Sequence, residues 1–173
     1  MLDVILAYRG EAQTTAAWLI CLAALKWGGG PERAIALIWL AVFELGHRGY
    51  HLLWNPIFQV DRFDTYHAMQ DLVVLLGFVM VALRANRMYP LWIAAFQLIA
   101  FSAHLARGIA DQITPIAYAA LVIGPSYFQL GLIAGGLALH MRRVRKSGPY
   151  RDWTQGSGNV GWQAFLSMPG RRA

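Results

Sequence analysis

The sequence is almost devoid of cysteine, and this scarcity excludes several classes of site. The single cysteine among the 173 residues is Cys21, which lies inside an apolar run. One thiol excludes an intramolecular disulfide, a zinc site with several cysteine ligands and an iron–sulfur cluster held by four cysteines. The sequence also contains no glycine-rich phosphate loop and no serine nucleophile elbow, so motifs assign no catalytic residue.

Charged residues are also scarce. They make up 14% of the chain, whereas 57% of the residues are hydrophobic, and an ordinary soluble domain has about a quarter charged residues. The net charge of +6 comes from basic residues at the ends of apolar runs, so it indicates membrane topology and contact with anionic lipid rather than nucleic acid. We therefore expect a multi-pass membrane protein.

Five apolar windows approach the length of about 20 residues that a helix needs to cross a bilayer. They are residues 12–27, 34–54, 65–84, 89–107 and 115–141. The first is the weakest, because charged residues and a Gly-Gly-Gly-Pro sequence bound it closely. The expected fold is an all-α bundle of five transmembrane helices, or of four if residues 12–27 do not span. Thr114 and Pro115 predict the start of the last helix, as N-cap and first-turn residues.

The distribution of lysine and arginine predicts the orientation. Most basic residues fall at one end of the predicted helices, and they include the run Arg142, Arg143, Arg145 and Lys146. The positive-inside rule makes that end cytoplasmic. We expect residues 1–146 to form the bundle, in a bacterial-type inner (plasma) membrane, and residues 147–173 to form a cytoplasmic tail. The basic run is expected to bind anionic lipids.

Three apolar windows contain ionisable residues spaced at i, i+3 and i+7, which places each set on one helix face. The sets are Glu44, His47 and His51; Asp64, His67 and Asp71; and His104, Arg107 and Asp111. Charged groups in hydrocarbon are costly, so such residues mark a candidate site. Counting 1.5 Å per residue places the histidines with Glu44 and Asp71 in one slab, roughly 15 to 26 Å from the cytoplasmic end. We therefore expect an outward-facing pocket between the second, third and fourth windows.

One interpretation of this pocket is metal or haem ligation. Imidazole and carboxylate groups at helical spacing suit a divalent transition metal, as in di-iron helix bundles. The candidate ligands are Glu44, His47, His51, His67, Asp71 and His104. Alternatively, His51 and His67 lie at the same depth, which suits a b-type haem bound from both faces.

Two other interpretations use the same residues. In the first, the charges form a structural network that needs no ligand, because they have plausible local partners, and three pairs are spaced four residues apart. These pairs are Glu44 with Arg48, Arg107 with Asp111, and His67 with Asp71. In the second, the histidines and buried carboxylates form a path for a proton or a solute. The sequence leaves the three interpretations open.

The competing function is that of a non-catalytic accessory or assembly subunit of a larger membrane complex. Gly131, Gly135 and Gly136 form a small-residue face on the last window, which suits close packing with a second copy of the chain or with a partner. Trp162, Phe165 and Leu166 in the tail are expected to dock on the membrane surface or on such a partner.

Overall fold

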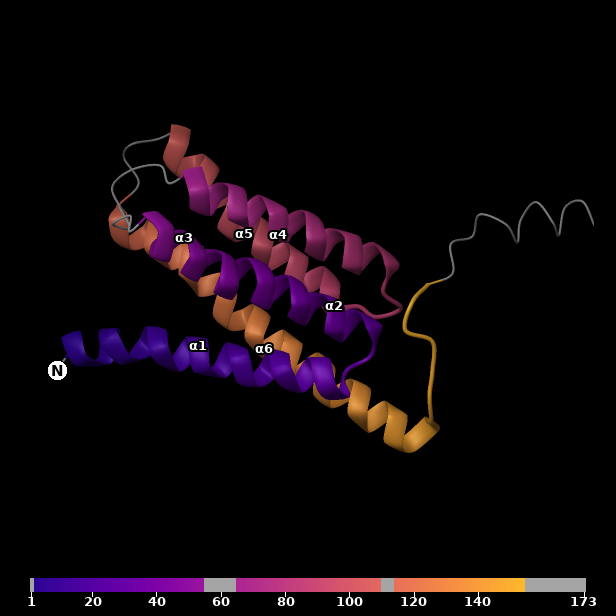
Figure 1. Cartoon of the computed structure of the whole chain (residues 1–173). Coiled ribbons are helices and arrows are strands. Elements are labelled where there is room, and N and C mark those ends of the chain that lie inside the picture. Colours follow the sequence, from indigo (N-terminus) through magenta and orange to yellow (C-terminus); the bar gives the residue numbers. More distant parts are fainter. Residues whose placement is uncertain (1, 55–64, 110–113, 155–173) are drawn as a thin grey trace, which may run out of the picture.

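The structure, a computed structural model, describes residues 2–54, 65–109 and 114–154, with side chains from Gly10 onward except those of His51, Trp54 and Pro115 (Figure 1). This part of the chain is helical almost throughout and contains no strand. Its helices are α1 (Leu2–Trp27), α2 (Gly30–Ile38), a π-helix η1 (Trp39–Gly46), α3 (His47–Trp54), α4 (Thr65–Arg84), α5 (Tyr89–Ile109) and α6 (Pro115–Ser147). The predicted all-α fold is confirmed for these residues.

The helices form a bundle in which α5 packs against both α4 and α6 (Figure 1). The short connection of residues 85–88 makes α4 and α5 run antiparallel. The segments α2, η1 and α3 follow one another as a single helical run, which packs on α4 through α2 and η1. Helix α1 packs on α2 and α6. The bundle thus consists of α1, the run from α2 to α3, α4, α5 and α6.

Three helices are long and apolar enough to cross a membrane. They are α4, α5 and residues Ile116–Ser147 of α6, and they correspond to the predicted windows 65–84, 89–107 and 115–141. The windows 12–27 and 34–54 are helical as well, but α1 is not among the three, and the second of these windows is divided among three shorter helices. The expectation of five spans is thus supported for three of them.

The outer surface of the bundle is strongly apolar. Large aliphatic side chains on α3, α4, α5 and α6 expose between 65% and 89% of their surface; they include Leu52, Leu83, Ile109, Ile116 and Leu139. Apolar surface of this extent is unfavourable in water. The same surface is well suited to contact with lipid chains.

The apolar core joins α1, α4 and α6. Cys21 is fully buried in this core together with Phe78 and Ile133, as expected for a lone cysteine that acts as a small hydrophobic residue. The close approach of α5 and α6 depends on Gly136, because a Cβ atom at this position would lie 2.8 Å from the ring of Tyr89. A larger residue there would force the ring to move.

After α6 the chain returns to the end of the bundle that contains the loop of residues 85–88, which we call the loop end (Figure 1). We call residues 149–154 the strap. Asn86 N donates to Asp152 O at 3.1 Å, and Thr154 N donates to Arg84 O at 2.8 Å. These bonds fix the strap across the loop end. The predicted docking residues Trp162, Phe165 and Leu166 lie outside the described residues.

A buried ion-pair cluster also fastens the strap. Arg87 pairs with Glu32 on α2 and with Asp152 on the strap, the latter at 2.5 Å, while Gly30 N donates to Asp152 Oδ2 at 2.7 Å. Glu32 is fully buried, and the Arg87 side chain is 7% exposed. Burial by itself lowers the pKa of Arg87, but the hydrogen bond and charge of Glu32, together with Asp152, outweigh burial and raise it. Arg87 therefore stays charged.

Candidate functional site

A cavity of about 390 Å³ lies inside the bundle, with walls from α1, η1, α3, α4, α5 and α6. Five of the predicted ligand residues line it: Glu44, His47, His67, Asp71 and His104. The side chain of the sixth, His51, lies outside the described residues, as do Asp64 and Asp111. Residues of the second, third and fourth predicted windows therefore meet at one cavity. Helices α1 and α6, which the prediction did not include, complete its walls.

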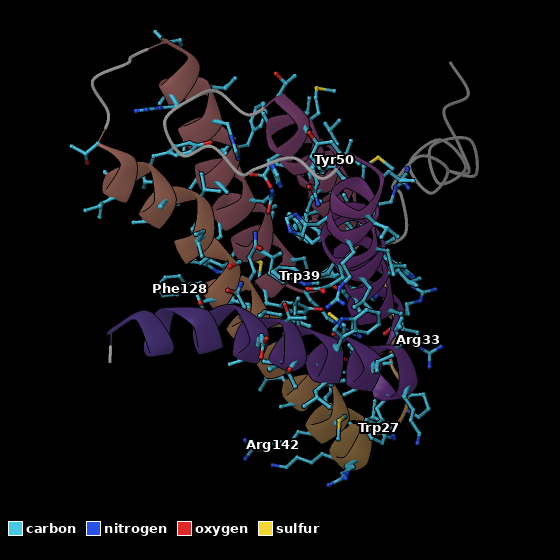
Figure 2. All side chains as sticks on the ribbon, turned by 60° about the vertical axis from the view of Figure 1, so that its left-hand side comes forward. Trp27, Arg33, Trp39, Tyr50, Phe128 and Arg142 are labelled. Carbon is cyan, nitrogen blue, oxygen red and sulfur yellow. The ribbon has the colours of Figure 1, made fainter. Side chains whose placement is uncertain are left out.

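The wall contributed by η1 owes its composition to π-helical geometry. Backbone hydrogen bonds in a π-helix join residues five apart, so side chains four and five positions apart share a face. Trp39, Phe43 and Glu44 have this spacing, and all three line the cavity. Figure 2 shows Trp39 in the interior of the bundle, where it is 3% exposed. The π-helix thus places a carboxylate and an indole on the same wall.

Two carbonyl groups of η1 accept hydrogen bonds from side chains of α4. Gln70 Nε2 donates to Val42 O, and Tyr66 Oη donates to Gly46 O, both at 2.7 Å. Buried carbonyl groups need such partners where helical hydrogen bonding is irregular. The two bonds join η1 to α4 along the cavity wall.

A buried network of hydrogen bonds connects α4, α5 and α6. Tyr118 Oη lies 2.8 Å from His104 Nδ1, and His104 Nε2 lies 3.2 Å from Asp71 Oδ2. Gln97 Nε2 donates to Asp71 Oδ1 at 3.0 Å, and Gln129 Nε2 donates to Gln97 Oε1 at 2.9 Å. All five side chains are buried, and His104 is completely so. The contact between His104 and Asp71 is close but is not aligned as a hydrogen bond.

Two histidines lie at the exposed end of the cavity. His47 Nδ1 and His67 Nε2 are 3.1 Å apart, which joins α3 to α4. Because a neutral imidazole has one donor and one acceptor, a single proton occupies the contact between these two nitrogens. The rings of Tyr50 and Tyr66 stack beside His67 with centroids 3.6 Å apart. His47 is exposed and His67 is half-buried, so the pair connects the protein surface with the cavity.

Glu44 has one neutral and one charged neighbour. Its Oε2 atom accepts from Trp18 Nε1 at 3.2 Å and lies 3.4 Å from Arg48 Nη2. The Arg48 side chain is 60% exposed, whereas that of Glu44 is 14% exposed. An ion pair this exposed contributes about 0–1 kcal/mol. The carboxylate therefore remains available on the cavity wall.

The other predicted ion pairs have different outcomes. Asp71 pairs across helices with His104 rather than along α4 with His67. Arg107 is buried, with its guanidinium carbon 5.9 Å from the centroid of the Tyr118 ring. Its predicted partner lies outside the described residues. The charges are thus held together mainly between helices.

Several buried polar atoms of the cavity wall have no hydrogen-bond partner within the described residues. They are Trp39 Nε1, Gln70 Oε1, Asp71 Oδ2 and His104 Nε2. The indole is a donor, the amide and carboxylate oxygens are acceptors, and the imidazole nitrogen is a donor or an acceptor according to its tautomer. Leaving a buried polar group without a partner costs about 1–3 kcal/mol. The wall therefore has hydrogen-bonding capacity that the described part of the chain does not use.

These side chains do not form a metal site among residues 10–54, 65–109 and 114–154. No group of three or more His, Cys, Asp or Glu residues is placed there to hold a metal ion. The donors are engaged in pairs instead, His47 with His67 and Asp71 with His104. The predicted metal-binding set is therefore not supported. The predicted haem is not supported either, because His67 Nε2 contacts His47 and the side chain of His51 is outside the described residues.

Sequence reasoning missed the amides of the site. Four glutamines line the cavity: Gln13, Gln70, Gln97 and Gln129. The predicted site rests on ionisable residues, although a buried amide also needs hydrogen-bond partners. A search of the apolar windows for glutamine would have found them. Ser126 lines the cavity too, and its hydroxyl accepts from Gln13 Nε2 and donates to Ile123 O, both at 2.6 Å.

The cavity combines carboxylates, imidazoles and amides inside an apolar bundle, and its described lining contains neither lysine nor arginine. Carboxylates and imidazoles can accept, hold and release protons, and the amides supply hydrogen bonds to them. Comparison with known proteins adds no assignment, because no protein family, no curated protein and no solved structure matches this chain.

Proposed function

We propose that this chain is a small multi-pass membrane protein whose polar cavity takes up and holds a proton. The observation that supports this most directly is the buried contact between Asp71 Oδ2 and His104 Nε2 at 3.2 Å. Neither atom has an aligned hydrogen bond in the described part of the chain. When the histidine is neutral, the pair carries one negative charge in an apolar interior, which is unfavourable. Uptake of one proton makes the pair neutral overall, so the cavity favours it.

The other polar groups of the cavity provide a route for this proton. His47 and His67 stand between the exposed surface and the cavity, and Glu44 lies on the wall beside them. A polar cavity of this volume has room for water, which bridges groups that do not touch. The route would end at His104, whose other nitrogen contacts Tyr118. Each step uses a group that can both accept and release a proton.

The orientation of the cavity follows from charge. The loop end contains Arg87, and the basic run forms the last turns of α6 near it, so the positive-inside rule favours a cytoplasmic position for this end. The exposed His47 lies in the outward half under this rule, because α2 begins near the loop end and α3 follows it. We therefore propose an inner-membrane protein with a cytoplasmic C-terminus and a cavity that receives protons from outside.

The proposal can be tested on isotopically labelled protein purified in detergent. Imidazole nitrogen and carboxyl carbon resonances would be followed between about pH 5 and 8, the range in which histidine charge changes are expected. We expect His104 to change its protonation state in this range and Asp71→Asn to move that transition. Glu11→Gln, the same chemical change at an exposed carboxylate, should leave it unchanged. A His104 that keeps one state throughout, or that ignores Asp71→Asn, would rule out the proposed proton site.

The alternative function, an accessory subunit of a larger complex, has separate support. A Cβ atom at Gly131 or Gly135 would meet nothing within 4 Å among the described residues, so this face of α6 is open to a second helix. Gly131→Leu should then disrupt a homo-oligomer or release a co-purifying membrane subunit. That result, combined with a cavity that binds no proton, would favour the accessory role.

A further inference from the structure

A second cavity, of about 810 Å³, lies at the loop end of the bundle between α5, α6 and the strap. Three of the four residues of the predicted lipid-binding run line it, namely Arg142, Arg143 and Lys146, whereas Arg145 does not. Figure 2 shows Arg142 at the C-terminal end of α6. The basic residues of this run are therefore not equivalent, although all of them are exposed.

The positive charges of this cavity fall into two groups. Arg87 also lines it, but its charge is balanced by the two carboxylates of the ion-pair cluster at the loop end. Arg142, Arg143 and Lys146 have no carboxylate within ion-pair distance among the residues that the structure describes. Three cations thus face one cavity, and no carboxylate of the described ranges 10–54, 65–109 and 114–154 is paired with them.

Tyr150 of the strap organises the cationic wall. Its ring centroid lies 4.8 Å from the guanidinium carbon of Arg143 and 5.0 Å from that of Arg87. The Tyr150 hydroxyl also lies 2.9 Å from His140 Nδ1, which fixes the ring against α6. Stacking of this kind holds a guanidinium in one orientation, and its planar set of donors matches phosphate oxygens. Arg143 is thereby positioned before any anion arrives.

Part of the cavity wall is apolar and exposed. Met88, Trp92 and Leu139 line the cavity and expose 71%, 61% and 65% of their surface. Met88 immediately precedes α5, Trp92 lies in the first turn of α5, and Leu139 lies on α6 one turn before the basic run. Under the proposed orientation this level is near the cytoplasmic membrane surface, where lipid phosphate groups lie above hydrocarbon chains. Cations and apolar surface thus lie side by side in one cavity, which matches the phosphate group and the acyl chains of a phospholipid.

We propose that this cavity binds the phosphate group of an anionic phospholipid, with Arg142, Arg143 and Lys146 as its cationic contacts. Trp92 and Leu139 would then lie beside the upper part of the acyl chains. Because Tyr150 belongs to the strap, the bound lipid would also stabilise the strap against the loop end. The site is independent of the proton cavity, which lies deeper in the bundle and shares no residue with it.

The test uses full-length protein in an uncharged detergent and three probes: dioleoylphosphatidylglycerol, dioleoylphosphatidylcholine and inorganic phosphate at matched ionic strength. The unfolding temperature is measured as each probe is added. We expect the anionic lipid to raise it at low mole fraction and the zwitterionic lipid to have little effect. Arg142→Gln with Arg143→Gln should weaken the apparent affinity about fivefold for each charge removed.

The matched control removes two exposed arginines that do not line the cavity, Arg145→Gln with Arg151→Gln. It should change the affinity less than twofold. Equal losses in the two double variants would mean that only general surface charge is involved, and retained binding in the site variant would overturn the proposal. Protection by inorganic phosphate equal to that by the lipid would assign the site to a free anion and refute the lipid. Should the site variant not fold, Lys146→Gln alone decides between the same outcomes.

Discussion

Replacing Arg87 by methionine should destabilise the bundle more than replacing its partner Glu32 by glutamine. Arg87→Met leaves Glu32 and Asp152, two carboxylates held by one guanidinium, without a cation between them. Glu32→Gln leaves Arg87 still paired with Asp152. Removal of one member of a buried ion pair costs about 3–5 kcal/mol. Arg87→Met should therefore lower the free energy of unfolding more than Glu32→Gln does.

The expected magnitudes follow from burial. Glu32 is fully buried, whereas the Asp152 side chain is 29% exposed, so the greater penalty falls on Glu32 when Arg87 is removed. We expect a loss of about 3–5 kcal/mol in the free energy of unfolding for Arg87→Met and about 1–3 kcal/mol for Glu32→Gln. Arg84→Met, at a neighbouring exposed arginine, serves as the control and should change stability by about 0.5 kcal/mol or less.

Reversible unfolding of the purified variants in detergent, followed by helical circular dichroism, measures these differences. Equal losses in the two variants, or a larger loss for Glu32→Gln than for Arg87→Met, would refute the reasoning.

Three further predictions concern other parts of the bundle. A double-mutant cycle of Glu44→Gln and Arg48→Met, measured by the same unfolding assay, should give a coupling energy below about 1 kcal/mol, because Arg48 is largely exposed. A coupling energy of several kcal/mol would mean that this ion pair stabilises the fold. Gly136→Ala should lower the free energy of unfolding by about 1–3 kcal/mol, because its Cβ atom would press on the Tyr89 ring of α5. Gly131→Ala, whose Cβ atom would lie in open space, should leave stability unchanged or increase it. Equal effects of the two variants would contradict the packing of α5 against α6 at Gly136. Deletion of residues 148–173 should leave the helices inserted but speed hydrogen exchange at the loop amide bonded to the strap, and unchanged exchange would show that the strap does not hold the loop.

The sequence predicts the helices well where local signals suffice. The long apolar runs identify α4, α5 and α6 because their boundaries coincide with polar or glycine-rich and proline-rich sequence. The start of α6 is also predicted in detail, since Thr114 Oγ1 accepts from Ala117 N at 3.4 Å and Pro115 occupies the first turn. These features depend on neighbouring residues alone.

The sequence predicts the partners within the site less well. Depth along a helix can be counted from sequence, and it places Asp71 near both His67 and His104. The rotation of α4 about its axis relative to α5 cannot be counted from sequence. This rotation determines that Asp71 faces His104 on α5. Likewise, no local signal shows that Glu32 in the first turn of α2 and Arg87 in the connection of residues 85–88 meet at the loop end. Such contacts result from packing between distant segments.

The π-helix has a consequence for how this chain tolerates changes in length. Each residue of an α-helix turns the chain by about 100°, so a deletion in a regular helix rotates everything beyond it away from its partners. A π-helical turn accommodates more residues than an α-helical turn, and the segment from Trp39 to Gly46 thus holds surplus chain between α2 and α3. Loss of one residue there would tighten the turn to ordinary α-helix while α2 stays on α4 and His47 stays near His67. The same loss within α4 or α5 would turn half of the buried network outward.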